Sequence, residues 1–410
     1  MRYKKKSANK VIYLLIILFI GAIALGMNNK DESKKIHENI IIENTHVGKM
    51  TKKDAINKLN EVYPLKDINI KYINKQWILK PNDIDLSYNI EKSVNEAFYY
   101  TRDESIWKNI RRKGKLNINK TYEIKLRATY DEAKLSDKLN EICKEINIDA
   151  VDASFHVESN GEIKRSESRQ GKEVDVSRLK ESIYDMINKK EIKDMYLPVM
   201  TIYPKVLTEQ VESINYILGQ FSTSFNDHTS RGSNIHVAGE ATSDILLMPG
   251  ETFSYNKTTG ARNWANGYKS APVIVGGKVV NGEGGGVCQV STTIYNAALI
   301  SGLSIEEVHN HSLPSRYAPR GRDATVSYGY TDLKFSNPFT HPVHIKNIVG
   351  NGAITSKIYG CKMDKERIII KIEEEYKKEK IIVQTYRLYL DEENNAIRKE
   401  LVNTSKYKSN

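Results

Sequence analysis

One cysteine of this chain stands where its sulfur could do chemistry. Cys288 follows the glycine-rich stretch Gly282–Gly286 and opens an apolar segment that ends at Gly302. Apolar side chains recur at helical spacing in this segment, at Val290, Ile294, Ala297 and Ala298. Glycine commonly ends a helix, and the spacing predicts a helix with Cys288 in or near its first turn.

This position has two chemical consequences. The partial positive charge at a helix N-terminus stabilises a thiolate and so lowers the pKa of a cysteine. The N–H groups of a glycine-rich turn can also receive the oxyanion that forms during acyl transfer. Cys288 is therefore a candidate nucleophile.

A nucleophilic cysteine needs a base and a group that orients the base. Two histidines follow in the segment Glu307–Ser312, and His311 is our first candidate for the general base, with His309 second. Asp323 is the first candidate for the carboxylate that orients the imidazole, and Asp332 is the second.

Simpler interpretations of the same residues remain open. The glycines could only form a tight turn, and Cys288 could be a buried small side chain. The His-x-His pattern could bind a metal if both imidazoles lay on one face of a strand, but no further ligands can be identified. We therefore predict no metal and no other cofactor.

The N-terminus predicts a membrane anchor. Residues 1–10 are rich in lysine and arginine, and residues 11–27 carry no charge. At about 1.5 Å per residue this apolar stretch spans roughly 25 Å as a helix, enough for a bilayer core. The basic flank places the N-terminus in the cytoplasm and the remainder of the chain outside. A cleaved signal peptide is the competing interpretation.

Charge and cysteine content agree with an exported protein. The net charge of +11 suits an anionic surface, such as lipid headgroups or anionic wall polymers, whereas export excludes nucleic acid as a partner. Three cysteines are too few for a disulfide framework. We expect Cys143 to be buried on a helix face and Cys361, in a polar turn region, to react as an ordinary thiol.

The predicted fold class is α+β with several domains. After a linker at residues 28–38, residues 39–127 and 128–205 form two small repeats, each with helices and strands. The first repeat begins with a helix capped by Thr51 and Asp54. Residues 206–350 form a glycine-rich mixed α/β domain, and residues 351–410 a strand-rich tail with a turn at 391–395 that supports it.

Sequence motifs of this chain resemble those of two known families. The G-x-x-T-x-x-x-A opening at residues 48–55 and the stretch QGKEVD at 170–175 resemble peptidoglycan-binding-like modules. A plain spacer that lifts the next domain off the membrane is the alternative. The block from Phe221 to about Ile348 resembles the VanW domain through a series of motifs in order: RGSNI at 231–235, MPGETFS at 248–254, GYKSAPVI at 267–274, the segment 284–293, HNHS at 309–312, GRDATV at 321–326 and DLKF at 332–335.

The VanW resemblance implies a cell-wall role and takes its name from glycopeptide-resistance clusters. Membrane-anchored members similar to this chain imply L,D-transpeptidase activity, in which a cysteine forms a thioester with a stem peptide of peptidoglycan and 3-3 cross-links result. The nucleophile would be Cys288. The candidate substrate-binding residues are Gly285, Gly286, Gln289, Ser291, Thr292, Tyr268 and Arg262.

Two other functions remain open at this stage. A cysteine peptidase or amidase would hydrolyse wall peptides, and its product would be a shortened monomer. A binding protein for stem peptides or a glycopeptide would use Cys288 only structurally, so that Cys288→Ser would leave its function intact.

Overall fold

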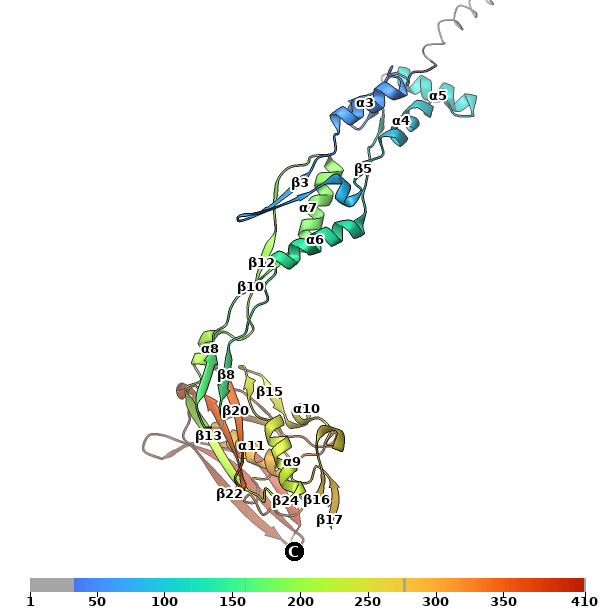
Figure 1. Cartoon of the computed structure of the whole chain (residues 1–410). Coiled ribbons are helices and arrows are strands. Elements are labelled where there is room, and N and C mark those ends of the chain that lie inside the picture. The colour runs from blue at the N-terminus through green and yellow to red at the C-terminus, as the bar shows by residue number, and fades with distance from the viewer. Residues whose placement is uncertain (1–32, 119, 159, 276–277, 409–410) are drawn as a thin grey trace, which may run out of the picture. The chain divides into compact units, whose positions relative to one another are not determined.

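The computed structural model describes residues 33–408 apart from 119, 159 and 276–277 (Figure 1). Its internal contacts divide the chain into two units: residues up to 149 with 171–202 form the N-terminal unit, and 150–170 with the residues from 203 onward form the C-terminal unit. The stretch 11–27 lies outside the described residues. Within the described part, no helix is long and apolar enough to cross a membrane.

The N-terminal unit contains two hydrophobic cores. The first joins a three-stranded sheet to three helices: β1 (Ile40–Ile42), β2 (Thr45–His46), β6 (Tyr122–Ile124), α3 (Lys52–Val62), α4 (Ile90–Tyr99) and α5 (Ile106–Asn117). Helix α3 confirms the predicted start, because the Thr51 side chain accepts a hydrogen bond from the Asp54 N–H. Ala55 and Leu59 of α3 are buried in this core.

The second core of this unit gathers strands from both predicted repeats. Its elements are β3 (Ile68–Tyr72), β4 (Lys75–Leu79), η1 (Pro81–Ile84), α6 (Glu132–Ile146), α7 (Val176–Lys189) and β11 (Met195–Tyr196). Three short strand pairs also lie in this unit: β5 (Ser87–Tyr88) with β7 (Ala128–Thr129), β10 (Gly171–Val174) with β12 (Val199–Ile202), and β3 with β11. The packing thus crosses the boundary drawn at residue 127, since β3 and β4 lie in the same core as α6 and α7.

The C-terminal unit is built around a four-stranded antiparallel sheet and a buried helix. The sheet order is β13 (Tyr216–Ser224), β21 (Ala353–Gly360), β20 (Val343–Gly350) and β14 (Ile245–Leu247). Helix α11 (Val287–Ser301) packs on it, with Val290, Ile294 and Leu299 fully buried. Gly302 ends α11 in a left-handed conformation (φ 86°), as the sequence predicted.

Smaller elements surround this core. They are β8 (Ser154–Val157), β9 (Ile163–Ser166), α8 (Thr208–Glu212), α9 (Ser230–Ala241), β15 (Thr252–Ser254), α10 (Tyr255–Thr259), η2 (Trp264–Asn266), β16 (Ser270–Val275), β17 (Lys278–Glu283), β18 (Ser304–Glu307), β19 (Lys334–Ser336) and η3 (Lys362–Asp364). Strands β16 and β17 form a hairpin that leads directly into the glycine-rich turn before α11. The order β15-β19-β18 makes a second sheet.

The C-terminal tail is continuous with this unit. Strand β21 pairs with both β13 and β20 inside the main sheet, so the boundary drawn at residue 350 cuts through a hairpin. The remaining strands, β22 (Ile368–Lys377), β23 (Lys380–Leu390) and β24 (Ala396–Lys408), form a separate antiparallel sheet. The predicted turn at 391–395 joins β23 to β24.

Arg387 of β23 connects this sheet to the C-terminal end of α11 by hydrogen bonds. Its side chain is 1% exposed. Its guanidinium donates to the carbonyls of Leu299 at 2.9 Å and Leu303 at 2.6 Å. These carbonyls lie at the helix C-terminus, where backbone oxygens lack partners within the helix.

We expect Arg387→Ala to lower the free energy of unfolding by about 3 kcal/mol, because it leaves buried carbonyls without donors and opens a cavity. Urea unfolding of the full chain in detergent measures this. Arg398→Ala is the matched control: that side chain is 57% exposed, so its loss should cost less than about 1 kcal/mol. Equal effects of the two substitutions would contradict the role given to Arg387.

Candidate functional site

The structure places Cys288 in the first turn of α11, directly after a strained glycine turn. Gly284 and Gly286 have φ angles of 74° and 113°, which disfavour other residues. At Gly285 a Cβ would lie 2.7 Å from the Pro272 carbonyl oxygen. Glycine is therefore required here for close backbone packing, and the turn delivers Cys288 half-buried, with Sγ 3.6 Å from the Val326 carbonyl oxygen.

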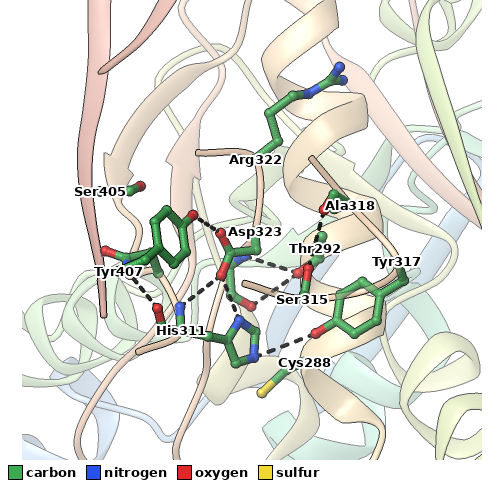
Figure 2. A network of polar contacts seen from close by, with 12 residues as sticks. Cys288, Thr292, His311, Ser315, Tyr317, Ala318, Arg322, Asp323, Ser405 and Tyr407 are labelled. Carbon is green, nitrogen blue, oxygen red and sulfur yellow. Dashed lines mark hydrogen bonds and ion pairs between the residues drawn. The ribbon is translucent and has the colours of Figure 1, made fainter. Parts of the chain in front are cut away.

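His311 and Asp323 lie beside this thiol, as Figure 2 shows. The Asp323 carboxylate is 1% exposed; its Oδ2 lies 2.6 Å from His311 Nδ1 and accepts from the His311 backbone N–H at 2.7 Å. The carboxylate thus fixes the imidazole, leaving Nε2 on the side of Cys288 (Figure 2). The candidate nucleophile, base and orienting carboxylate of the sequence analysis thus lie together in the structure.

Electrostatics favour a charged pair. Burial acts to raise the pKa of the Cys288 thiol, but its interactions with His311 outweigh burial, so this pKa lies below its ordinary value. Burial acts to lower the pKa of His311, whereas Asp323 and Cys288 raise it to about 9. Both shifts favour a thiolate paired with an imidazolium.

Two tyrosines complete the site, and neither was predicted from the sequence. The Tyr317 hydroxyl lies 3.5 Å from His311 Nε2. The Tyr407 hydroxyl, on strand β24, donates to Asp323 Oδ1 and accepts from the Gly321 N–H at 2.7 Å. Tyr317 lies only six positions after His311 and could have been suspected, but no local pattern connects Tyr407 to Asp323.

The alternative base and carboxylate lie elsewhere. His309 is 46% exposed, and its Nε2 pairs with Glu307 at 3.1 Å. The Asp332 carboxylate accepts from the Ser254 hydroxyl at 2.6 Å and the Asn256 N–H at 2.8 Å, so it holds the start of α10. Of the two histidines, the structure brings His311 to Cys288.

Three predicted substrate-binding residues do not fit that role. Gln289, Ser291 and Thr292 are buried, with exposed fractions of 1%, 0% and 0%. Gln289 Nε2 donates to the Thr223 hydroxyl, and the Ser291 hydroxyl donates to the Ala324 carbonyl. The Thr292 hydroxyl accepts from the Ala324 N–H at 2.9 Å. All three side chains face inward from α11: Ser291 and Thr292 hold the segment that carries Asp323, whereas Gln289 bonds to β13.

Arg262 and Tyr268 remain suited to a polar ligand. Arg262 Nη2 donates to Asn256 Oδ1 at 2.6 Å, whereas its buried Nε and Nη1 have no hydrogen-bond partner among the described residues. Its charge also acts to lower the pKa of Cys288. The buried Tyr268 hydroxyl likewise has no partner in the described part of the chain. Donors of this kind fit a carboxylate.

A depression opens near Arg262. The depression has a volume of about 610 Å³. Asn256, which accepts the hydrogen bond from Arg262, is one of its lining residues. Tyr328 lines it and lies under the Arg262 side chain, with 5.9 Å from the guanidinium carbon to the ring centroid. Its lining carries charges of both signs, with Lys257 and Lys334 beside Glu307 and Asp332. Lys334 Nζ pairs with Glu307 at 2.9 Å.

One group of side chains away from Cys288 has metal-ligand chemistry. Donor atoms of His341, Cys361 and Asp364 lie within 4.8 Å of one another. His341 Nδ1 and the Asp364 carboxylate already form an ion pair at 3.1 Å, so the group is satisfied without a metal, and we assign it none. Cys361 is 5% exposed; the expectation that it reacts as an ordinary thiol is therefore wrong, because β21 and η3 enclose it.

The charged pair predicts a pH dependence for alkylation. In Asp323→Asn the imidazolium loses its carboxylate, so the pKa of His311 should fall and that of Cys288 should rise. Alkylation of Cys288 by iodoacetamide should slow about tenfold at pH 6.5 and approach the wild-type rate near pH 9.5. Glu307→Gln changes a carboxylate that pairs with exposed His309 and with Lys334 and that accepts from the Asp332 N–H; it should leave the profile unchanged. An unchanged profile in Asp323→Asn would contradict the assignment.

Comparisons with known proteins agree with the resemblances seen in the sequence. Residues 230–359 match the family model described as VanW like protein, and residues 77–195 match one described as Putative peptidoglycan binding domain. The chain is 40% identical over 174 residues to the uncharacterized protein YoaR of Bacillus subtilis, which covers 42% of this chain and 57% of YoaR. No solved structure matches.

A second relative carries a functional name. The chain is 31% identical over 109 residues to the vancomycin B-type resistance protein VanW of Enterococcus faecalis, covering 25% of this chain and 40% of that protein. The chain thus spans about half the length of these curated relatives. Fold and matches define a cell-wall-related protein of mixed α+β class with several domains. Within it, the chain carries a VanW-like domain and a peptidoglycan-binding domain.

Proposed function

We propose that the VanW-like domain is a cysteine acyltransferase, an L,D-transpeptidase that forms 3-3 cross-links between peptidoglycan stem peptides. The observation that carries this proposal is the arrangement of Cys288, His311 and Asp323, in which the pKa of the thiol is lowered and that of the imidazole is raised. The peptidoglycan-binding domain in the same chain supports a wall substrate.

The first step acylates Cys288. The thiolate attacks the carbonyl carbon between the third and fourth residues of a donor stem, and a carbon–sulfur bond forms as the amide carbon–nitrogen bond breaks. The His311 imidazolium gives its proton to the departing amine of the terminal D-alanine. The N-terminal end of α11 would favour the oxyanion electrostatically, because that end of a helix attracts negative charge.

The second step transfers the acyl group. The side-chain amine of the third residue of an acceptor stem attacks the thioester and forms the isopeptide bond, while neutral His311 takes the surplus proton. The Cys288 thiolate leaves and the charged pair is restored. Because a thioester reacts readily with amines, a positioned acceptor can outcompete water.

We further propose that residues 11–27 anchor the chain in the cell membrane, with the N-terminus in the cytoplasm and both units outside. The peptidoglycan-binding domain would then hold the wall near the VanW-like domain. Of the net charge of +11, five positive residues lie before the anchor, and the net charge of +6 left outside would favour anionic wall polymers. This placement brings the catalytic domain to its substrate.

Product analysis tests the proposed reaction. Full-length protein in detergent is incubated with disaccharide tetrapeptide, and the products are identified by mass spectrometry. A cross-linked dimer with release of one D-alanine is expected. A shortened monomer would instead indicate a peptidase, and unchanged substrate that co-purifies with the protein would indicate a binding protein.

A further inference from the structure

Helix α5 of the N-terminal unit presents two faces of very different character. Its inner face is fixed to the unit: Leu116 is 2% exposed, Asn109 Nδ2 donates to the Asp103 carbonyl at 2.7 Å, and Arg112 Nη1 donates to the Tyr100 carbonyl at 2.8 Å. These residues recur every three or four positions, so a single side of the helix is attached.

The opposite face is apolar and exposed. Ile106, Trp107 and Ile110 are 72%, 81% and 56% exposed, and Ile118 at the helix C-cap is 75% exposed. At about 100° per residue, Trp107 lies opposite Leu116, and Ile110 and Ile106 lie on one side of Trp107, about 120° and about 80° from Leu116. Because large apolar side chains gathered on one surface are unfavourable in water, such a patch marks a surface that binds something.

Basic residues border this apolar face. Lys108, Arg111, Lys113 and Lys115 are exposed, and α5 has no acidic residue. An apolar stripe with a tryptophan and flanking lysines and arginines is the pattern of a helix that lies in the plane of a membrane surface. A soluble anionic polymer would use the charges alone and would leave the isoleucines and the tryptophan in water.

The attachment of α5 within its unit places it near the start of the described chain. Arg102, three residues before Ser105 at the N-cap of α5, donates from Nη2 to the carbonyls of Ser33 at 3.2 Å and Lys35 at 2.6 Å. From residue 27 to residue 33 the chain reaches at most about 20 Å. If residues 11–27 lie in the bilayer, as proposed above, α5 is held close to its surface.

We infer that α5 binds the outer surface of a bilayer containing anionic lipids. Trp107, Ile106 and Ile110 would enter the boundary between headgroups and acyl chains, while the lysines and arginines contact lipid phosphates. The N-terminal unit would then be attached to the membrane by a surface helix in addition to the proposed anchor. The inference is independent of the chemistry at Cys288.

Tryptophan quenching by brominated lipids tests this. The full chain carrying Trp77→Phe and Trp264→Phe, so that Trp107 alone fluoresces, is reconstituted into phosphatidylcholine vesicles with or without phosphatidylglycerol. Bromines on the acyl chains quench only indoles that reach them. We expect Trp107 emission to fall at least about twofold in the anionic vesicles and clearly less in the neutral ones or at high salt.

A matched variant separates the helix from the anchor. Ile106→Asp with Ile110→Asp changes only exposed side chains, so the unit should fold as before, and quenching should be lost while the protein still floats with the vesicles. Protein that does not float with the vesicles would contradict the proposed anchor at residues 11–27, which is a different proposal from the role of α5. Trp107 that remains unquenched in floating protein overturns the inference; a blue shift that grows with protein density would then assign the face to a second copy of the chain.

Discussion

Cys288→Ala is expected to abolish cross-linking while the protein still folds. Alanine fits the half-buried site, and the hydrogen bond of the thiol to the Val326 carbonyl is long, at 3.6 Å, so the free energy of unfolding should change little. Turnover should fall by at least about 10⁴-fold, because the proposed reaction needs the Cys288 sulfur to carry the acyl group between its two steps. The rate of dimer formation from disaccharide tetrapeptide measures this.

The other two cysteines provide matched controls. Burial raises the pKa of Cys143, and Cys361 is 5% exposed. Iodoacetamide at neutral pH should therefore label Cys288 first, and loss of dimer formation should follow that labelling. Cys143→Ala and Cys361→Ala should remain active. Cross-linking by the Cys288→Ala protein would exclude the acyltransferase and favour the binding protein.

His311→Ala should lower turnover by about 10²- to 10⁴-fold, the usual cost of losing a general base. The imidazole both stabilises the thiolate and gives its proton to the leaving amine, so the thiol of the variant should also need a higher pH for alkylation. His309→Ala is the control in the same segment: exposed and paired with Glu307, it should retain nearly full activity.

The two histidines make this comparison decisive. A larger loss with His309→Ala would exchange their roles and would require the loop to rearrange when substrate binds. Full activity in both variants would remove the nucleophile–base pair altogether. Circular dichroism and thermal unfolding of each variant show whether any loss arises from misfolding.

Local sequence patterns predicted the part of the site that lies on or near α11. The apolar spacing from Val290 onward gives the helix, Gly302 ends it, and the glycine turn places Cys288 at its start. His311 and Asp323 were chosen by chemistry and short separation, and the structure brings them together. Such patterns succeed because helix periodicity and turn glycines act over a few residues.

Long-range partners could not be predicted in this way. Tyr407 reaches Asp323 across 84 positions, and Arg387 reaches Leu299 across 88. Polar residues on α11 posed a related problem: Gln289 looks like a binding residue beside Cys288, but its side chain faces inward to Thr223. Only the packing of α11 against β13 decides which way it points.

The domain boundaries also could not be predicted from the sequence. Strands β3 and β4 alternate as predicted, but the pattern does not reveal that they join the core of α6 and α7. Strand β21 likewise has the spacing of a tail strand, although it lies in the main sheet between β13 and β20. Alternation specifies a strand, whereas its neighbours depend on the fold as a whole.

The mass of the intact protein tests the central claim most directly. Full-length wild-type protein and Cys288→Ala are each incubated with a tetrapeptide donor alone and quenched in acid. The mass of each intact protein is then measured by mass spectrometry. The account predicts that the wild-type protein gains the mass of the donor less one D-alanine, that the adduct maps to Cys288, and that hydroxylamine removes it. An unchanged wild-type mass, or the same adduct on Cys288→Ala, would contradict it.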